Sequence, residues 1–367
     1  EKFMQDAIQL AKRGRFSTHP NPSVGSVVVK DGKIVGKGFH LRAGLKHAEI
    51  NALEQAGDKS KGSTLYVTLE PCSFQGRTPA CAKAIINAGI NRVVVGTIDP
   101  DPRNSGRGIE ILREAGIKVV TNCLEAETSQ LVEGHIKRFR FGRPFVRLKL
   151  AMSLDGKTAL SGGQSKWITS ENARSDVQKL RAWSSAIVTG VGTIIHDDPA
   201  LSVRLQESDL PNSREIMSIE RPIYVLDSQL RIPLESKVLE RSSTVLVALE
   251  QESLRHHYDN EILYTKKNSG RVDLATVLNE LARREHSNVL FECGATLAGA
   301  LVEEKLFDEI ILYVAPKFLG DKAKSLLMLP ELARMSDYER LEIKDVRKIG
   351  DDFRVVLSSK YKRVKDD

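Results

Sequence analysis

The chain has 367 residues, which suggests two domains at roughly 150 residues each, and it carries a formal charge of +7. Hydrophobic residues make up 41% and charged residues 28%, which excludes a disordered chain, and no run approaches the roughly 18 apolar residues of a membrane helix. The first residues, EKFMQDAIQLAKRG, are amphipathic and lack the pattern of a secretory signal, so we expect a soluble, cytoplasmic protein.

The first part of the chain alternates strand and helix signals. Asp31-Gly32 separates two β-rich runs and predicts a hairpin turn. Strands are expected at residues 24–29, 33–39, 64–70, 92–98 and 117–120, and helices at 3–13, 47–57, 79–88, 108–116 and 124–140. This alternation predicts an α/β/α sandwich, with helices on both faces of the sheet.

Gly142 and Pro144 interrupt the pattern, so we place a boundary there, with domains at 1–143 and 144–367. Beyond it, strands are expected at 145–153, 185–190, 222–227, 244–249, 287–292 and 309–315, and helices at 170–183, 273–285 and 295–305. Residues 206–221 are polar and predict a surface loop, and the last 30 residues predict paired antiparallel strands. The second domain is therefore also α/β.

The positive charge is spread over the whole length, with a short mixed cluster at the C-terminus. A nucleic-acid-binding protein would gather this charge on one face, so we expect small phosphorylated partners and neither nucleic acid nor membrane.

The four cysteines are unevenly placed, since Cys72 and Cys81 lie close together while Cys123 and Cys293 stand alone. In a reducing compartment a close pair indicates a metal or catalytic site more often than a disulfide. Together with His47 they form a ligand set suited to Zn²⁺, and three protein ligands leave the fourth position open, as in catalytic sites. Glu49, two residues after His47, is the expected proton carrier.

At these residues the chain resembles the bifunctional deaminase/reductase family of riboflavin biosynthesis. The segments that carry the resemblance are THPNPSVG (18–25), HAE (47–49) and LEPCSFQGRTPAC (69–81). The resemblance implies a cytidine-deaminase-like first domain, in which a zinc-bound hydroxide attacks C2 of a diaminopyrimidinone ribosyl phosphate and ammonia leaves. It also implies a substrate site formed by Asn21, His40, Arg77 and Asp99.

Three positions depart from the family pattern in this region. Phe74, Ala80 and Asp101 stand where the family usually has His, Pro and Asn. The metal ligands and Glu49 are unaffected, so the departures concern how the pyrimidine and its ribose phosphate are held.

The second domain offers two Gly-bearing turns, at 189–193 and 293–300. In each, a strand passes through Gly into a following segment, which either presents backbone N–H groups to a phosphate or only allows close packing. The residues alone leave both interpretations open.

The segments KLAMSLDGK (149–157), SKW (165–167), GVGT (190–193), DDPAL (197–201) and LDS (226–228) resemble the reductase half of the same family, which is similar in fold to dihydrofolate reductase. The resemblance implies that NADPH reduces a ribosyl group to a ribityl chain. The implied cofactor contacts are Ala151, Trp167, Thr193, Asp197, Ser228 and the turn of Gly294, Ala295, Thr296, Leu297, Ala298, Gly299 and Ala300. The implied substrate contacts are Lys149, Ser165, Arg181, Leu201, Arg204 and Glu292, and Cys293 stands where the family has Gly.

Two other functions are considered. A nucleoside or tRNA base deaminase with an accessory nucleotide-binding domain predicts a CxxC pair and a basic, aromatic-lined face, whereas aromatic residues make up only 5% of this chain. A zinc-stabilised binding module predicts a closed four-ligand site. The favoured interpretation is a zinc- and NADPH-dependent bifunctional enzyme, and the resemblance implies a homodimer or larger homo-oligomer.

Overall fold

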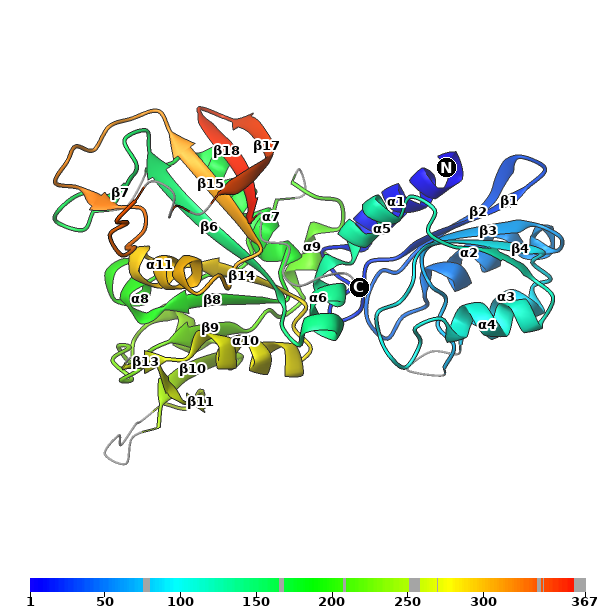
Figure 1. Cartoon of the computed structure of the whole chain (residues 1–367), viewed down its shortest axis with the longest axis horizontal. Coiled ribbons are helices and arrows are strands. Elements are labelled where there is room, and N and C mark those ends of the chain that lie inside the picture. The colour runs from blue at the N-terminus through cyan, green and yellow to red at the C-terminus, as the bar shows by residue number, and fades with distance from the viewer. Residues whose placement is uncertain are drawn as a thin grey trace. The chain divides into compact units, whose positions relative to one another are not determined.

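The computed structural model describes residues 1–74, 80–164, 168–206, 209–250, 258–268, 270–334, 338 and 340–359 (Figure 1). The chain divides into two compact units. The first consists of Glu1–Pro144 with Ala282–Ser287, and the second of Phe145–Leu281 with Asn288–Asp367.

The first unit is built on a five-stranded sheet with the order β2-β1-β3-β4-β5. Its strands are β1 (Gly25–Lys30), β2 (Lys33–Phe39), β3 (Thr64–Leu69), β4 (Arg92–Thr97) and β5 (Lys118–Val120). The hairpin of β1 and β2 is antiparallel and turns at Asp31 and Gly32, whose φ angles of 49° and 72° suit a tight hairpin turn. The strands β3, β4 and β5 are parallel.

Helices cover both faces of this sheet. They are α1 (Lys2–Gly14), α2 (Ala48–Ala56), the 3₁₀ turn Gly57–Ser60, α3 (Cys81–Asn87), α4 (Arg107–Glu114), α5 (Glu125–Leu131) and α6 (Glu133–Phe141). On one face α1 packs on the sheet through Met4 and Ile8, and on the other α2 and α3 pack through Leu53 and Ile85. The predicted α/β/α sandwich is confirmed.

Two glycines of β2 set the position of α2. A Cβ at Gly36 would lie 2.1 Å from the carbonyl oxygen of Ala52, and one at Gly38 would lie 2.1 Å from that of Ala48. Only glycine permits this approach of strand and helix backbones. It fixes the start of α2, where His47 and Glu49 lie.

The second unit has a nine-stranded sheet with the order β11-β10-β9-β8-β14-β6-β15-β18-β17. Its strands are β6 (Phe145–Ser153), β8 (Ala186–Gly190), β9 (Ile223–Leu226), β10 (Thr244–Leu249), β11 (Glu261–Thr265), β14 (Asn288–Glu292), β15 (Glu309–Ala315), β17 (Leu341–Ile349) and β18 (Asp352–Ser359). Neighbouring strands from β11 to β15 are parallel, whereas β18 and β17 are added antiparallel at one edge. Short pairs join β7 (Lys157–Ala159) to β16 (Lys324–Ser325) and β12 (Lys267–Asn268) to β13 (Arg271–Val272).

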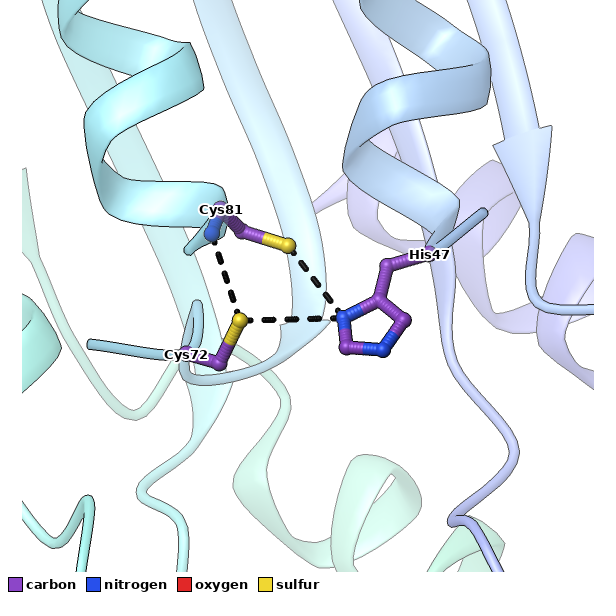
Figure 2. A group of neighbouring side chains, drawn as sticks. All are labelled: His47, Cys72 and Cys81. Atoms are coloured by element: carbon purple, nitrogen blue, oxygen red, sulfur yellow. Dashed lines mark hydrogen bonds between the residues drawn. The ribbon is translucent and has the colours of Figure 1, made fainter. Parts of the chain in front are cut away.

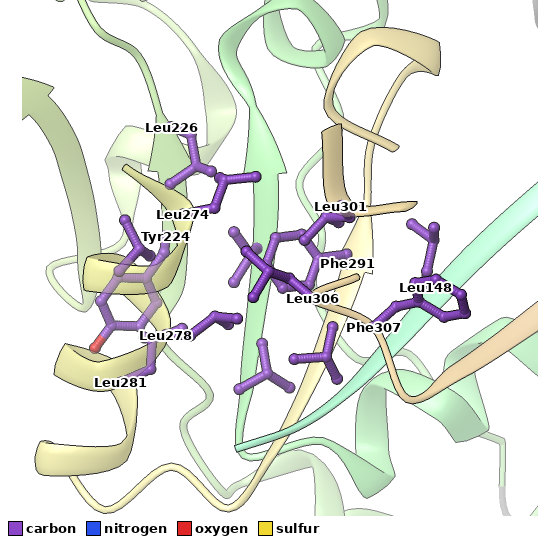
Figure 3. Close-up of a cluster of buried hydrophobic side chains, with 14 of the residues drawn as sticks. Leu148, Tyr224, Leu226, Leu274, Leu278, Leu281, Phe291, Leu301, Leu306 and Phe307 are labelled. Carbon is purple, nitrogen blue, oxygen red and sulfur yellow. The ribbon is translucent and has the colours of Figure 1, made fainter. Parts of the chain in front are cut away.

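Alternate residues of the central strands face opposite layers of helices. The helices are α7 (Glu171–Trp183), α8 (Val191–Asp197), α9 (Ser213–Met217), the 3₁₀ turn Lys237–Glu240, α10 (Leu274–Arg283) and α11 (Ala295–Glu303). Phe291 of β14 packs in the core shared with Leu278 of α10 and Leu301 of α11 (Figure 3). Its neighbour Leu290 packs against Leu180 of α7 on the other face. The α/β prediction for this domain is confirmed.

Three local predictions differ from the structure. The helix expected at 124–140 is two helices, because Val132 leaves the helical region with φ −122° and ψ 22° between α5 and α6. The loop expected at 206–221 contains α9, which is only five residues long and buries Ser213 and Ile216. The turn after β8 continues into α8. No helix within the described ranges is long and apolar enough to cross a bilayer.

Candidate active sites

Three metal-ligand side chains of the first unit converge from separate elements (Figure 2). His47 is the residue immediately before α2, Cys72 lies in the loop after β3, and Cys81 is the first residue of α3. The ligand set expected from the sequence is therefore brought together at the N-termini of two helices.

The spacing of the three ligand atoms fits a zinc ion. His47 Nδ1 lies 3.7 Å from Cys72 Sγ and 3.3 Å from Cys81 Sγ. Tetrahedral coordination with Zn–S near ~2.3 Å and Zn–N near ~2.0 Å separates such atoms by about 3.6 Å. All three ligand atoms lie within 4.8 Å of one another, so one ion can contact each.

The surroundings of Cys72 favour its thiolate. The backbone N–H of Cys81 donates to Cys72 Sγ at 3.2 Å. The pKa of the Cys72 thiol is lowered to about 5, because the Cys81 side chain and the His47 imidazole hydrogen-bond to its sulfur. A lowered thiol pKa prepares the sulfur for a metal, which binds the thiolate form.

Glu49 lies in the first turn of α2 and its side chain is only 3% exposed. Residues two apart on a regular helix point in different directions, but His47 precedes the helix with φ −70° and ψ 164°. This extended residue lets His47 and Glu49 line the same cavity. Burial raises the pKa of Glu49 to about 6.

Asn21 and His40 are paired beside this cluster. Asn21 Nδ2 donates to His40 Nε2 at 3.0 Å, and His40 Nδ1 donates to the carbonyl oxygen of Lys46 at 3.1 Å. Burial lowers the pKa of His40 to about 4, so its imidazole is neutral near pH 7. The His40 ring meets that of His47 edge-on, with centroids 5.2 Å apart.

A cavity of about 330 Å³ joins these side chains, a size within the range of small-molecule sites. Asn21, His40, His47, Glu49 and Cys72 line it, together with Asp99. Arg77, the remaining residue implied for this substrate site, lies outside the described residues.

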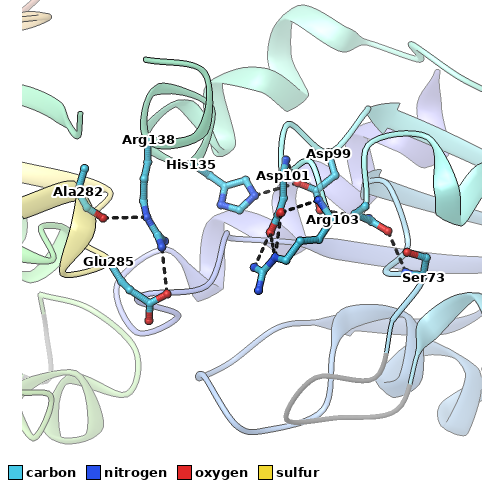
Figure 4. Close-up of polar contacts among 9 residues, drawn as sticks. Ser73, Asp99, Asp101, Arg103, His135, Arg138, Ala282 and Glu285 are labelled. Carbon is cyan, nitrogen blue, oxygen red and sulfur yellow. Dashed lines mark hydrogen bonds and ion pairs between the residues drawn. The ribbon is translucent and has the colours of Figure 1, made fainter. Parts of the chain in front are cut away.

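The Asp99 carboxylate is hydrogen-bonded by residues of its own loop and by His135 of α6 (Figure 4). Its Oδ1 accepts from the backbone N–H of Asp101 at 3.0 Å and its Oδ2 from Asn104 Nδ2 at 3.1 Å. His135 of α6 contributes Nε2 at 3.0 Å from Asp99 Oδ1. The sequence motifs did not reveal His135, because it lies 36 residues away on a helix without a motif.

Glu70 was also absent from the expected site. Its carboxylate accepts backbone N–H groups of Gly106 at 2.9 Å, Gly108 at 3.0 Å and Asp99 at 3.2 Å. Burial raises the pKa of Glu70, and these hydrogen bonds oppose that rise. Glu70 therefore ties the strand that ends at the metal ligands to the loop that carries Asp99.

In the second unit, many of the implied cofactor and substrate residues gather at the carboxyl ends of parallel strands. Ligands of open α/β sheets bind at such ends where the strand order reverses, and here β14 is inserted between β8 and β6. Ala151 lies near the end of β6, Thr193 after β8, Ser228 after β9 and Gly294 after β14. The topology thus assembles residues from four strand ends.

Lys149, Arg181 and Glu292 form one buried cluster. Arg181 donates to Glu292 through Nε at 2.5 Å and Nη2 at 3.0 Å, while Lys149 Nζ lies 3.9 Å from Glu292 Oε2. Burial lowers the pKa of Lys149, although Glu292 opposes this change. The arrangement places two cations, Lys149 from β6 and Arg181 from α7, beside the carboxylate at the end of β14.

The glycines at 294 and 299 differ in their surroundings. A Cβ at Gly299 would lie 1.9 Å from the carbonyl oxygen of Met328, so this glycine serves close packing. A Cβ at Gly294 would meet nothing within 4 Å, so space lies beside the N-terminus of α11. Close packing therefore accounts for Gly299 within α11, whereas Gly294 has the open space that a bound phosphate would require.

The remaining implied residues are placed as follows. Ser228 Oγ accepts from the backbone N–H of Val272 at 3.3 Å, and Asp197 ends α8. Leu201 is buried with φ 47°, whereas Arg204 is exposed and donates its backbone N–H to Gln178 at 2.9 Å. Ala295, Thr296, Leu297, Ala298 and Ala300 belong to α11. Ser165 and Trp167 lie outside the described residues.

Comparison with known proteins agrees with both sites. Residues 144–355 match the RibD C-terminal domain, and residues 1–97 match the cytidine and deoxycytidylate deaminase zinc-binding region. The chain is 45% identical to riboflavin biosynthesis protein RibD of Escherichia coli over 96% of this chain and 97% of that protein. It is similar to the structure of Acinetobacter baumannii RibD, with a TM-score of 0.90 and 41% identity over 98% of each chain. A diaminohydroxyphosphoribosylaminopyrimidine deaminase/5-amino-6-(5-phosphoribosylamino)uracil reductase from Thermotoga maritima matches with a TM-score of 0.85 and 34% identity, again over 98% of each chain.

Proposed function

Since the chain belongs to the RibD family of bifunctional riboflavin biosynthesis deaminase/reductases, we propose that it catalyses two consecutive steps on phosphoribosyl pyrimidine intermediates. The first is hydrolytic deamination of 2,5-diamino-6-(5-phosphoribosylamino)pyrimidin-4(3H)-one. The second is NADPH-dependent reduction of the ribosyl group of 5-amino-6-(5-phosphoribosylamino)uracil to ribityl. We assign deamination to residues 1–143 and reduction to residues 144–367.

The observation that carries the deaminase proposal is the convergence of His47, Cys72 and Cys81 beside Glu49 in one cavity. The donor set and its spacing fit Zn²⁺, which when bound supplies a water nucleophile at neutral pH. Glu49 accepts a proton from the attacking water and delivers it to the amino group on C2. The C–N bond then breaks and ammonia leaves.

The raised pKa of Glu49 suits this double role, because a group that titrates near neutral pH both accepts and donates protons readily. Asn21 and neutral His40 present hydrogen-bonding groups to the pyrimidine, and Asp99 lines the same cavity. Arg77 completes the proposed substrate contacts.

For the reductase, a nucleotide cofactor is implied by the domain, and we propose that it is NADPH. The open space at Gly294 and the N-terminus of α11 suit a phosphate, since the first backbone N–H groups of a helix have no partner within the helix. The proposed cofactor contacts are Ala151, Trp167, Thr193, Asp197, Ser228 and Gly294 to Ala300. NADPH supplies the hydride for the ribosyl carbon.

Lys149, Arg181 and Glu292 are the proposed core of the reductase substrate site, with Ser165, Leu201 and Arg204. Guanidinium groups bind phosphate through paired hydrogen bonds, and exposed Arg204 has its side chain available for this role. Arg181 is engaged by Glu292, so its contribution is to position that carboxylate and to neutralise it.

The test combines three measurements on the purified protein: zinc content, ammonia release and NADPH oxidation after addition of the diaminopyrimidine phosphate. We expect one zinc per chain, ammonia release without NADPH, and NADPH oxidation only after deamination. Ammonia release without any oxidation of NADPH or NADH would overturn the reductase half, and a metal-free protein that still deaminates would overturn the zinc assignment.

We further propose a homodimer or larger homo-oligomer that acts in the cytoplasm, where its four cysteines remain reduced. Light scattering coupled to gel filtration gives the mass in solution. A mass of about one chain at micromolar concentration would contradict the oligomer.

A further inference from the structure

Arg103 lines the deaminase cavity next to a buried carboxylate and an aromatic ring. Its Nε lies 3.0 Å from both carboxylate oxygens of Asp101, and its Nη2 lies 2.6 Å from Asp101 Oδ2. Its guanidinium carbon stands 5.1 Å from the ring centroid of Phe74. The guanidinium is thus held on two sides, by Asp101 and by the Phe74 face.

The cavity is rich in acids and poor in cations. Among the described residues, its lining includes five carboxylates, those of Glu49, Glu70, Asp99, Asp101 and Glu285. The guanidinium groups there are those of Arg103 and Arg138. A substrate with a phosphate dianion would be repelled by these carboxylates unless a cation meets the phosphate, and the described residues offer Arg103 and Arg138 for this contact.

The two arginines differ in how freely a ligand can reach them. Arg138 donates Nε to the carbonyl oxygen of Ala282 at 3.1 Å and Nη2 to Glu285 at 3.0 Å, and its side chain is 16% exposed. The Arg103 side chain is 68% exposed, while its partner Asp101 is 6% exposed. Within the described part of the chain, Nη1 of Arg103 has no hydrogen-bond partner. Asp101 and Phe74 therefore hold the Arg103 guanidinium in place, while the edge that carries Nη1 is accessible to a ligand.

We propose that Arg103 binds the phosphate of the deaminase substrate, so that it determines specificity for the phosphorylated over the dephosphorylated pyrimidine. This inference rests on the proposed deaminase function. Asp101 and Phe74 act as positioning residues: they hold the guanidinium at the cavity wall before the substrate arrives, which reduces the entropy lost on binding. Asp101 also limits the strength of binding, because it competes for the same cation.

The test compares ammonia release from the phosphorylated substrate and from the same compound after removal of its phosphate. For Arg103→Met we expect KM for the phosphorylated substrate to rise about 10-fold or more, the loss typical of a charged hydrogen bond, with kcat little changed. KM for the dephosphorylated compound should stay within about twofold of wild type. Arg103→Lys should recover part of the lost affinity because it keeps the charge.

Two further variants separate phosphate binding from simple neutralisation of Asp101. In the unmodified chain the backbone N–H of Arg103 donates to Asp101 Oδ1 at 2.9 Å, and Asp101→Asn retains this acceptor and an amide oxygen that can still position the guanidinium. Because the variant removes only the competing negative charge, it should lower KM for the phosphorylated substrate. In the double variant Asp101→Asn with Arg103→Met, no carboxylate is left unpaired. If Arg103 binds phosphate, the double variant still shows the raised KM; if Arg103 only neutralises Asp101, wild-type KM returns and the inference is wrong.

Arg107→Met is the matched control, since Arg107 is an exposed arginine four residues further on that does not line the cavity. It should leave both KM values unchanged. Absence of ammonia release from wild-type protein would contradict the proposed function. Normal release by wild type with equal KM values for wild type and Arg103→Met would contradict the role of Arg103 alone.

Discussion

Arg181 and Glu292 form a two-pronged ion pair across 111 residues of sequence, with Nε to Oε1 at 2.5 Å and Nη2 to Oε2 at 3.0 Å. Both side chains are about nine-tenths buried. Removing one partner leaves an unpaired buried charge, and this lowers stability far more than replacing both partners with apolar residues.

Arg181→Met should therefore destabilise the reductase domain by about 3 kcal/mol or more. Lys149, at 3.9 Å from Glu292, compensates only in part. Lys179→Met on the same helix is the control, because Lys179 is 37% exposed and its contact with Asp209 is 3.8 Å long. Thermal unfolding of the two variants tests this prediction. Equal midpoints for Arg181→Met and Lys179→Met would mean that removing the buried cation does not destabilise the domain.

The same pair predicts a pH dependence. Burial raises the pKa of Glu292, but the charge and hydrogen bonds of Arg181 outweigh it, so the pKa lies below its usual value. A carboxyl whose folded pKa is depressed stabilises the fold above its unfolded pKa, about 4.3, and loses that contribution as pH falls through the folded value. The free energy of unfolding of wild type minus that of Glu292→Gln should be constant from pH 7 to 5 and shrink below ~4.3. Glu303→Gln, at an exposed position of α11, controls for removal of a carboxylate. A difference that grows in acid would contradict this sign.

The hydrogen bonds of Glu70 predict that this residue keeps the loop carrying Asp99 rigid. Glu70→Gln replaces one carboxylate oxygen by an NH₂ group, which cannot accept the N–H bonds of Gly106 or Gly108. We expect a loss of about 2 kcal/mol in stability and a lower rate of ammonia release, because the loop carrying Asp99 loosens. Glu114→Gln at the exposed end of α4 should change neither. Hydrogen exchange of residues 99–109 measures the loosening directly, and unchanged protection there would refute it.

The turn before α11 allows folding and cofactor binding to be tested separately. Gly299→Ala places a Cβ 1.9 Å from a backbone oxygen and should destabilise the domain by about 3 kcal/mol. Gly294→Val fills open space, so its cost in stability should stay near ~1 kcal/mol while the Kd for NADPH rises about 10-fold. Fluorescence titration with NADPH and thermal unfolding distinguish the two. A Gly294→Val protein with wild-type NADPH affinity would remove this turn from the proposed cofactor site.

Most elements were predictable because their signals are local. The β-branched runs of β4 and β10 and the Asp31-Gly32 turn depend on neighbouring residues only, and the strands that were predicted with bounds lie within two residues of those observed. The edge strand β11 and the short strands β7, β12, β13 and β16 were missed. The metal ligands were predictable because their order and spacing follow from the strand and helices that carry them. The break at Val132 was not predictable, since the sequence around it is compatible with a continuous helix.

The parts that sequence reasoning missed depend on long-range packing. His135 meets Asp99 only because α6 packs beside the loop after β4, and no pattern near His135 indicates it. Arg103 follows Asp101 by two residues, yet the stacking on Phe74 appears only once the loops after β3 and β4 lie together. The family resemblance implied that Arg181 and Glu292 belong to the substrate site. That their side chains pair directly became visible only once the order of the strands in the sheet was known.

Glu49 provides the test of the deaminase mechanism itself. Glu49→Gln keeps the size of the side chain but removes the proton acceptor, so ammonia release should fall by roughly 10² to 10⁴ while zinc content and the circular dichroism spectrum persist. His47, Cys72 and Cys81 remain as ligands in this variant, which separates loss of the proton carrier from loss of the metal. Glu54→Gln on the same helix is the control, since Glu54 is 54% exposed and pairs with Lys46 at the surface. If zinc were lost together with activity, Glu49 would be holding the site together rather than moving the proton. If ammonia release were unchanged, another group would have to carry the proton from water to the departing amine.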